Sequence, residues 1–149
     1  MKVINDLKNT VEEIANHLGS CDAQLLSKKP LPNKWSKKEL LGHLIDSGIN
    51  NLQRFTEIQF MAKPFTFHNY RQDDLVAAND YQHADISELL AFYKSINQRI
   101  IKVMELQTDE TLQYEIINPN NNQKTDLKFL MIDYVDHMNH HYQQILRIK

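Results

Sequence analysis

The sequence predicts an all-α fold, a four-helix bundle in which each helix buries one face. The 149 residues include only three glycines. Four long stretches place apolar residues three and four positions apart, the spacing of an amphipathic helix. The length fits a single domain over residues 1–149 that can bury a hydrophobic core without disulfides. Four such helices cover their apolar faces best by packing against one another as a bundle.

The first predicted helix begins at Val3 and ends at Leu18. Its apolar residues recur at helical spacing, and they are Val3, Ile4, Leu7, Val11, Ile14 and Leu18. Gly19 follows, and we expect it to end the helix in a left-handed conformation. The next segment contains Pro30 and Pro32, which break helical hydrogen bonding, so it is predicted to be a linker.

The second predicted helix begins at Ser36, which forms a capping box with Glu39. Its apolar face comprises Leu41, Leu44, Ile45, Gly48, Leu52 and Phe55. Pro64 interrupts the pattern, and the residues up to position 84 are predicted to form a long connection with a short helix near residues 73–79. A connection of this length in a small domain is often functional.

The third predicted helix starts at Asp85, with Glu88 completing a second capping box, and ends near Gln107. The next segment has β-prone residues on both sides of the run NPNNN, residues 118–122, so a small hairpin and an irregular turn are equally compatible with it. The fourth helix then begins near Thr125 or Asp126 and continues to the end of the chain.

Composition argues against large charged partners. Seventeen Lys and Arg residues against 19 Asp and Glu residues give a net charge of −2, so the chain has no field that would attract nucleic acid or an anionic membrane. The only cysteine, Cys21, excludes an intrachain disulfide and is compatible with a reducing compartment. The N-terminal segment lacks the apolar core of a signal peptide, and no stretch is long enough to span a bilayer. We therefore expect a cytoplasmic protein.

The segment HMNHHYQQ, residues 137–144, holds three of the seven histidines. Residues four apart lie on one face of a helix, so His137 and His141 can direct their imidazoles to a common point while His140 points elsewhere. Such a pair has two interpretations: a metal site, or two histidines satisfied by backbone carbonyls and water. The pair alone lacks the third ligand that a stable site needs.

His43, in the second helix, is the candidate third ligand. The helical wheel places it off the centre of the apolar stripe, so we expect the site in an open groove where a polar side of this helix meets the fourth helix. Three imidazoles holding zinc or nickel, with further positions open, are typical of a catalytic metal site. Asp133, one turn before His137, has two equally supported interpretations: it orients His137, or it is a plain surface acid. Gln144 is the corresponding orienting candidate for His141.

Other side chains have structural and functional interpretations. Trp35 is expected to pack against Leu40 as a hydrophobic staple rather than to contact substrate. The long connection is a possible lid over the site, although a solvated loop is the more frequent outcome. Its candidate residues are His68, His83, Asp73, Asp74, Tyr70 and Tyr81. Cys21 is expected to be a small, partly buried residue rather than a nucleophile.

The segments KWSKKELLGHLIDS and HMNHHYQQI together resemble the paired signatures of the DinB-like (DinB/YfiT) superfamily, and the resemblance extends over nearly the whole chain. It implies a four-helix bundle of DinB/YfiT type with a long crossover connection, which the segment 60–84 accommodates. It also implies that His43, His137 and His141 bind a divalent metal ion, zinc or nickel. Tyr142 stands where many relatives have a smaller residue, which would narrow the groove.

Activities in this superfamily include transferases and isomerases that use a low-molecular-weight thiol, and metal-dependent hydrolases, while many members have no known reaction. The resemblance therefore implies a metal-dependent enzyme that activates a thiol or water for attack on a small-molecule substrate. The alternatives are a non-catalytic metal-binding or stress-related bundle, and a structural dimer whose histidines bind no metal. A homodimer is compatible with the family, but the sequence names neither the catalytic residues nor the substrate.

Overall fold

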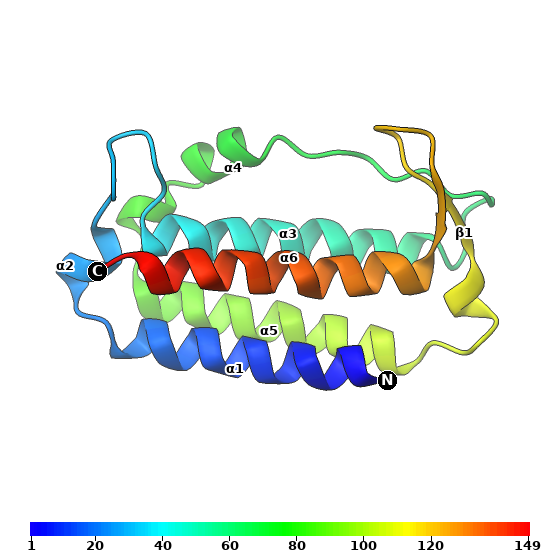
Figure 1. The fold of residues 1–149 in the computed structure, drawn as a ribbon, viewed down its shortest axis with the longest axis horizontal. Coiled ribbons are helices and arrows are strands. Elements are labelled where there is room, and N and C mark those ends of the chain that lie inside the picture. Colours follow the sequence, from blue (N-terminus) through cyan, green and yellow to red (C-terminus); the bar gives the residue numbers. More distant parts are fainter.

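A computed structural model describes all residues, 1–149, and it contains four long helices that pack side by side (Figure 1). These helices are α1 (Lys2–Ser20), α3 (Lys37–Glu57), α5 (Ile86–Glu105) and α6 (Leu127–Arg147). Two short helices, α2 (Ala23–Ser27) and α4 (Gln72–Ala78), lie in the connections. The prediction of an all-α four-helix bundle is confirmed, and α4 falls where the sequence predicts a short helix.

The order of the helices around the bundle requires a crossover. Helix α3 packs against α5 and α6, and α1 packs against the same two helices, so α1 lies diagonally opposite α3. Helices α3 and α5 run in the same direction, and residues 58–85 return the chain along the outside of the bundle between them (Figure 1). The predicted long crossover connection is therefore confirmed.

The capping residue that opens α3 is the one that the sequence predicts. The Ser36 hydroxyl accepts a hydrogen bond from the Glu39 backbone N–H, and the Glu39 carboxylate accepts one from the Ser36 N–H at 2.9 Å. At the start of α5, the Asp85 carboxylate accepts bonds from the N–H groups of Ser87 and Glu88. Glu88 makes no return bond, so the second predicted capping box forms only its N-cap half.

The predicted end of the first helix is wrong. Gly19 remains inside α1, no glycine adopts a positive φ, and the helix ends at Ser20, followed by Cys21 with an extended backbone. Asp22 directly caps the next helix, where its carboxylate accepts a hydrogen bond from the Leu25 N–H at 2.8 Å. Because α2 begins at once, the chain turns through an extended residue and needs no left-handed one.

A small hairpin closes the far end of the bundle. Strand β1 (Glu115–Ile117) pairs antiparallel with β2 (Lys124–Asp126), and Asn122 in the turn has a φ of 57°, which asparagine tolerates. Phe65 adds a bridge to Ile116 and so ties the start of the crossover to the hairpin. Of the two alternatives left open for this segment, the hairpin is the one that forms.

The crossover covers the outer side of α3. Tyr81, in the 3-10 helix Tyr81–His83, lies so close to Gly42 that a Cβ atom at this glycine would be 2.0 Å from the tyrosine ring. The Tyr81 hydroxyl donates a 2.7 Å hydrogen bond to the buried Asp46 carboxylate, one turn further along α3. A glycine at position 42 is therefore required for the crossover to pack on α3.

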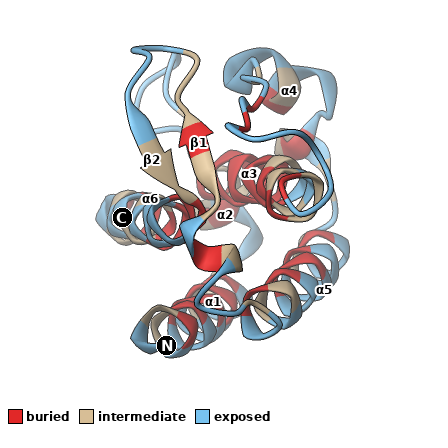
Figure 2. Cartoon of the chain, turned by 90° about the vertical axis from the view of Figure 1, so that its right-hand side faces the viewer, coloured by how far each residue is buried: buried red, intermediate tan, exposed pale blue.

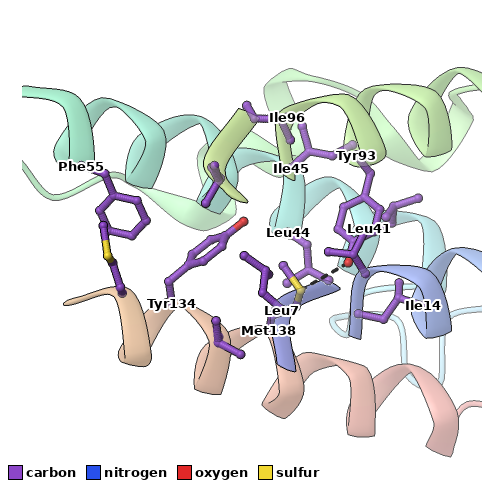
Figure 3. Packing of buried hydrophobic residues seen from close by; sticks show 14 of the residues in the cluster. Leu7, Ile14, Leu41, Leu44, Ile45, Phe55, Tyr93, Ile96, Tyr134 and Met138 are labelled. Atoms are coloured by element: carbon purple, nitrogen blue, oxygen red, sulfur yellow. Dashed lines mark hydrogen bonds between the residues drawn. The ribbon is translucent and has the colours of Figure 1, made fainter. Parts of the chain in front are cut away.

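The core lies between the four long helices, and end-on the buried residues face inward on each (Figure 2). In its interior the Tyr93 hydroxyl contacts the Met138 sulfur at 3.3 Å, beside Leu41 (Figure 3). Tyr134 donates a 2.6 Å hydrogen bond to Asn97 and packs edge-on against Phe55. Each large apolar side chain buried in this way stabilises the fold by roughly 1.5–3 kcal/mol. None of the helices has the length and apolar character needed to cross a membrane.

Candidate metal centre

Three histidine side chains from two helices converge on one point. His43 lies in α3, and His137 and His141 lie one turn apart on α6. The Nε2 atom of His43 is 3.1 Å from that of His137 and 3.0 Å from that of His141, and the α6 pair is 3.0 Å apart. The structure thus brings together all three residues that the sequence predicts as ligands.

Burial keeps these imidazoles neutral. His43 is fully buried, and its surroundings lower its pKa to about 3, mainly because burial penalises the charged ring. Burial also lowers the pKa of His137 to about 4 and lowers that of His141. At neutral pH each ring therefore offers a lone pair rather than a positive charge, which is the state that binds a metal ion.

Gln144 fixes the orientation of one of these rings. The Nδ1 of His141 donates a 2.7 Å hydrogen bond to the Gln144 side-chain carbonyl, so its Nε2 is left with the lone pair. Gln144 also contacts the exposed His140, which lies outside the cluster of three although its ring is 5.1 Å from that of His141. The spacing of three along α6 places Gln144 here, as expected.

Of the two interpretations of Asp133, the structure supports the surface acid and not the orienting role. No hydrogen bond joins Asp133 to His137; its side chain is exposed and lines a second cavity together with Arg54. A position four residues before a helical histidine is close enough for such a bond, but the Asp133 side chain instead lines the cavity that Arg54 also lines. His137 therefore has no carboxylate partner.

The three nitrogens are arranged for a cation rather than for hydrogen bonds to one another. The His141 proton sits on Nδ1, so only one of the other two Nε2 atoms can carry a proton without a clash between protons across the 3.1 Å edge from His43 to His137, and hydrogen bonds cannot satisfy all three contacts. A divalent ion about 2.0–2.1 Å from each nitrogen would accept all three lone pairs at once. The residues present thus fit a metal ion.

Trp35 contacts this centre directly. Its ring lies 4.8 Å from the imidazole of His43, tilted by 33°. It also lines a cavity of about 480 Å³ together with Leu40. Trp35 does lie near Leu40, as the staple hypothesis requires, but the hypothesis misses its contact with a candidate ligand.

This cavity opens beside the histidines and lies under α4. It is lined by His141, Gln144, Arg147 and Ile148 from the end of the chain, by Gln72 and Asp73 of α4, and by Pro30, Asn33, Lys34, Trp35 and Leu40. Figure 1 shows the loop of residues 28–36 and α4 standing above the same end of α3 and α6. The expected open groove is present in part: an open cavity lies between the start of α3 and α6, but it reaches His141 only, because His43 is fully buried.

The other candidates of the crossover separate into two groups. Asp73 lines the cavity, so the N-terminus of α4 covers part of it, as the lid hypothesis requires. The remaining side chains make contacts elsewhere: Asp74 pairs with Arg71, His83 with Asp80 at 2.6 Å, and Tyr70 lies beside Arg54. Cys21 is half-buried and contacts His17, as expected for a packing residue.

Sequence reasoning missed two cations that line the cavity, Lys34 and Arg147. A weak signal for Arg147 exists: His141, Gln144 and Arg147 follow one another at intervals of three along a single helix, which places them close to one face. Lys34 carries no such pattern, because it lies in an irregular loop whose position depends on the fold.

Comparison with solved structures places this architecture among known bundles. YfiT from Bacillus subtilis, described as a probable metal-dependent hydrolase with an unusual four-helix bundle topology, is 21% identical and superimposes with a TM-score of 0.89 over 99% of this chain and 83% of its own. A mycothiol-dependent maleylpyruvate isomerase is 9% identical, with a TM-score of 0.73, over 95% of this chain and 58% of its own.

A DinB-like protein from Bacillus subtilis is 18% identical, with a TM-score of 0.64 over 98% of this chain and 87% of its own. At these identities the structural matches establish the fold alone. Among curated proteins, none matches the sequence. The family model of the DinB superfamily matches residues 6–145, nearly the whole length. The chain therefore belongs to the DinB superfamily.

Proposed function

We propose that this protein is a metal-dependent enzyme in which His43, His137 and His141 hold one divalent ion, zinc or nickel. The observation that carries the proposal is the convergence of three neutral Nε2 atoms, 3.0–3.1 Å apart, beside a cavity of about 480 Å³. A volume of this size accommodates a small molecule. The cavity reaches His141, so a ligand in it would approach the metal from the α6 side.

The chemistry of the donor set favours activation of a weak acid. When bound, the ion would lower the pKa of a coordinated thiol or water and so supply a nucleophile at neutral pH. No carboxylate contacts the three nitrogens, so the protein would leave the charge of the ion uncompensated. Gln144 would hold the His141 ring in place, and the Trp35 ring would keep water from one side of His43.

The substrate would be a small electrophile, attacked by a low-molecular-weight thiol or by water. The similar structures support both reaction types, since one is described as a probable metal-dependent hydrolase and another as mycothiol-dependent. The proposal includes a cytoplasmic location and a small-molecule partner rather than nucleic acid or a membrane, supported by the balanced charge and the single cysteine. The proposal also includes the assembly of two copies of the chain into a homodimer.

A second candidate function is a non-catalytic metal-binding bundle. The observation that favours it is that no carboxylate contacts the three histidines, and that the one further imidazole nearby, His140, is exposed with its ring 5.1 Å from that of His141. An enzyme of the proposed kind needs no separate base, because the ion itself promotes loss of the proton. The two candidates therefore differ in turnover and not in metal binding.

The experiment that separates them is a pair of turnover assays on zinc-loaded and nickel-loaded protein. Transfer of a thiol to 1-chloro-2,4-dinitrobenzene, with chloride as the leaving group, tests the transferase; release of nitrophenol from 4-nitrophenyl acetate tests the hydrolase. Wild type and the exposed-site control His140→Ala should turn over at least one substrate, and His43→Ala should not. Rates in wild type that equal those of His43→Ala for both reactions would contradict an enzyme.

A further inference from the structure

Two cations lie unpaired in the cavity beside the histidines. Lys34 comes from the loop before α3, and Arg147 from the last turn of α6. Neither forms an ion pair or a side-chain hydrogen bond within the chain, although seven other ion pairs do form. Asp73 is the only acid in the lining, and it is not paired with either cation. The lining is therefore positively charged even before a metal ion is counted.

Arg147 is placed to work together with the histidines. His141, Gln144 and Arg147 all line the cavity. Six residues of helix span about 9 Å. The long arginine side chain leans toward the N-terminus of its helix, and so back toward His141. A small ligand can therefore contact the region of His141 at one end and the guanidinium at the other.

The walls of the cavity suit an elongated ligand with a charged end. Trp35, Leu40 and Ile148 provide apolar surface, whereas Lys34 and Arg147 provide the only positive side chains. A guanidinium binds a carboxylate through two parallel hydrogen bonds, and a nearby ammonium adds a point charge. Both side chains are exposed and unpaired, so a neutral ligand beside them would gain neither interaction.

We propose that this cavity selects ligands that carry an anionic group, such as a carboxylate, which Arg147 and Lys34 bind while the other end of the ligand reaches the metal. This inference rests on the proposed function, since it assigns the substrate class of the same site. The Asp73 carboxylate, on the α4 side of the cavity, would repel an anionic group and so weaken this preference. We expect this preference to come from the cavity, because the ion alone would bind ligands that have the same donor group equally well.

Three thiols of similar size test the proposal, with cobalt loaded in place of the native ion. They are 3-mercaptopropionate (anionic), 2-mercaptoethanol (neutral) and cysteamine (cationic). Each is titrated while the thiolate-to-cobalt absorption band is followed, which gives a dissociation constant without any turnover. For each variant we take the ratio of the dissociation constants of 3-mercaptopropionate and 2-mercaptoethanol. The thiol pKa values of the two probes are the same in every variant, so a change in this ratio reflects the protein.

The variants are Arg147→Gln, Lys34→Gln and Asp73→Asn, with Lys128→Gln as the control. Lys128 is an exposed lysine of α6 outside the cavity. We expect wild type to bind 3-mercaptopropionate most tightly. Arg147→Gln and Lys34→Gln should each weaken its binding about tenfold relative to 2-mercaptoethanol. Asp73→Asn should shift the ratio in the opposite direction, and Lys128→Gln should leave it unchanged.

Each failure has a different meaning. If 2-mercaptoethanol binds the cobalt but the ratio is the same in wild type, Arg147→Gln and Lys34→Gln, the selection of anions is wrong and the proposed function stands. A ratio that changes equally in Lys128→Gln also overturns the selection, because the effect would then come from overall charge. If cobalt does not bind, or no thiol perturbs its spectrum, both the inference and the thiol branch of the proposed function are wrong.

Discussion

Helices α3 and α6 both supply histidines to the candidate metal centre, but they are buried to different degrees. In α3, 13 of 21 residues are buried, against eight of 21 in α6. The crossover covers α3 on its outer side, whereas α6 keeps one side open to the cavity. The comparison indicates that α3 supplies a fixed ligand whose surroundings stabilise the fold, and that α6 supplies the accessible side of the site. Substitutions on the two helices should therefore have different consequences.

The largest expected effect comes from Gly42→Ala on α3. The added methyl group would lie 2.0 Å from the Tyr81 ring, so the crossover must move and the bond from Tyr81 to Asp46 must break. We expect a loss of about 3 kcal/mol in the free energy of unfolding, measured by urea denaturation.

The matched control is Gly19→Ala, a helical glycine whose added methyl group would have its nearest neighbour at 4.0 Å. It should keep or raise stability, by up to about 1 kcal/mol, because alanine is the better helix former. Equal effects of the two substitutions would contradict the role assigned to the crossover as a cover for α3.

The second prediction concerns the pH dependence of the metal-free protein. In the fold the pKa of His43 is about 3 and that of His137 about 4, against 6.5 for an unperturbed histidine. Between these values the unfolded chain binds more protons than the folded one, so the free energy of unfolding should fall as the pH falls below about 6.5.

Urea denaturation at a series of pH values from 7.5 to about 4.5 measures this slope. His43→Gln removes one of the titrating groups and should give a shallower slope than wild type. A metal-free wild type that gains stability on acidification, or a slope that His43→Gln does not change, would contradict neutral, buried imidazoles.

The third prediction compares two positions on α6. Gln144 bonds to the ring of His141, whereas Asp133 makes no bond to His137. Gln144→Ala should weaken zinc binding about tenfold, as measured by competition with a chromogenic chelator. Asp133→Ala should bind zinc like wild type. Weaker zinc binding in Asp133→Ala than in Gln144→Ala would show that the Asp133 carboxylate, and not the Gln144 amide, orients a ligand when the metal is present.

The bundle could be predicted from the sequence because its causes are local. The apolar spacing and the Ser36–Glu39 capping box each depend on residues close together in the chain, and both form as expected. At the asparagine-rich turn, the hairpin forms, which is one of the two alternatives that the sequence allows. The prediction that Gly19 caps the first helix is wrong because a glycine near a helix end does not reveal how the chain continues. Here Asp22 caps the next helix directly, so the chain turns through an extended residue.

The surroundings of the site could not be predicted, because they depend on contacts between distant segments. The apolar stripe of α3 suggested a partly exposed His43, but His43 is fully buried. Tyr81 covers the neighbouring Gly42, and the Trp35 ring packs on the His43 imidazole. Lys34 reaches the cavity only because its loop stands beside α4. The identities of the three histidines could be predicted, since their helical spacing and the superfamily motifs both point to them.

The most direct test of the central claim is the metal content of protein purified without an affinity tag, measured by mass spectrometry for wild type, His137→Ala and His140→Ala. His140 is the matched control, an exposed histidine on the same helix whose ring lies 5.1 Å from that of His141. We predict about one equivalent of zinc or nickel in wild type and in His140→Ala, and its loss in His137→Ala. Wild type that binds no metal after incubation with either ion, or equal metal loss in both variants, would contradict the three-histidine centre.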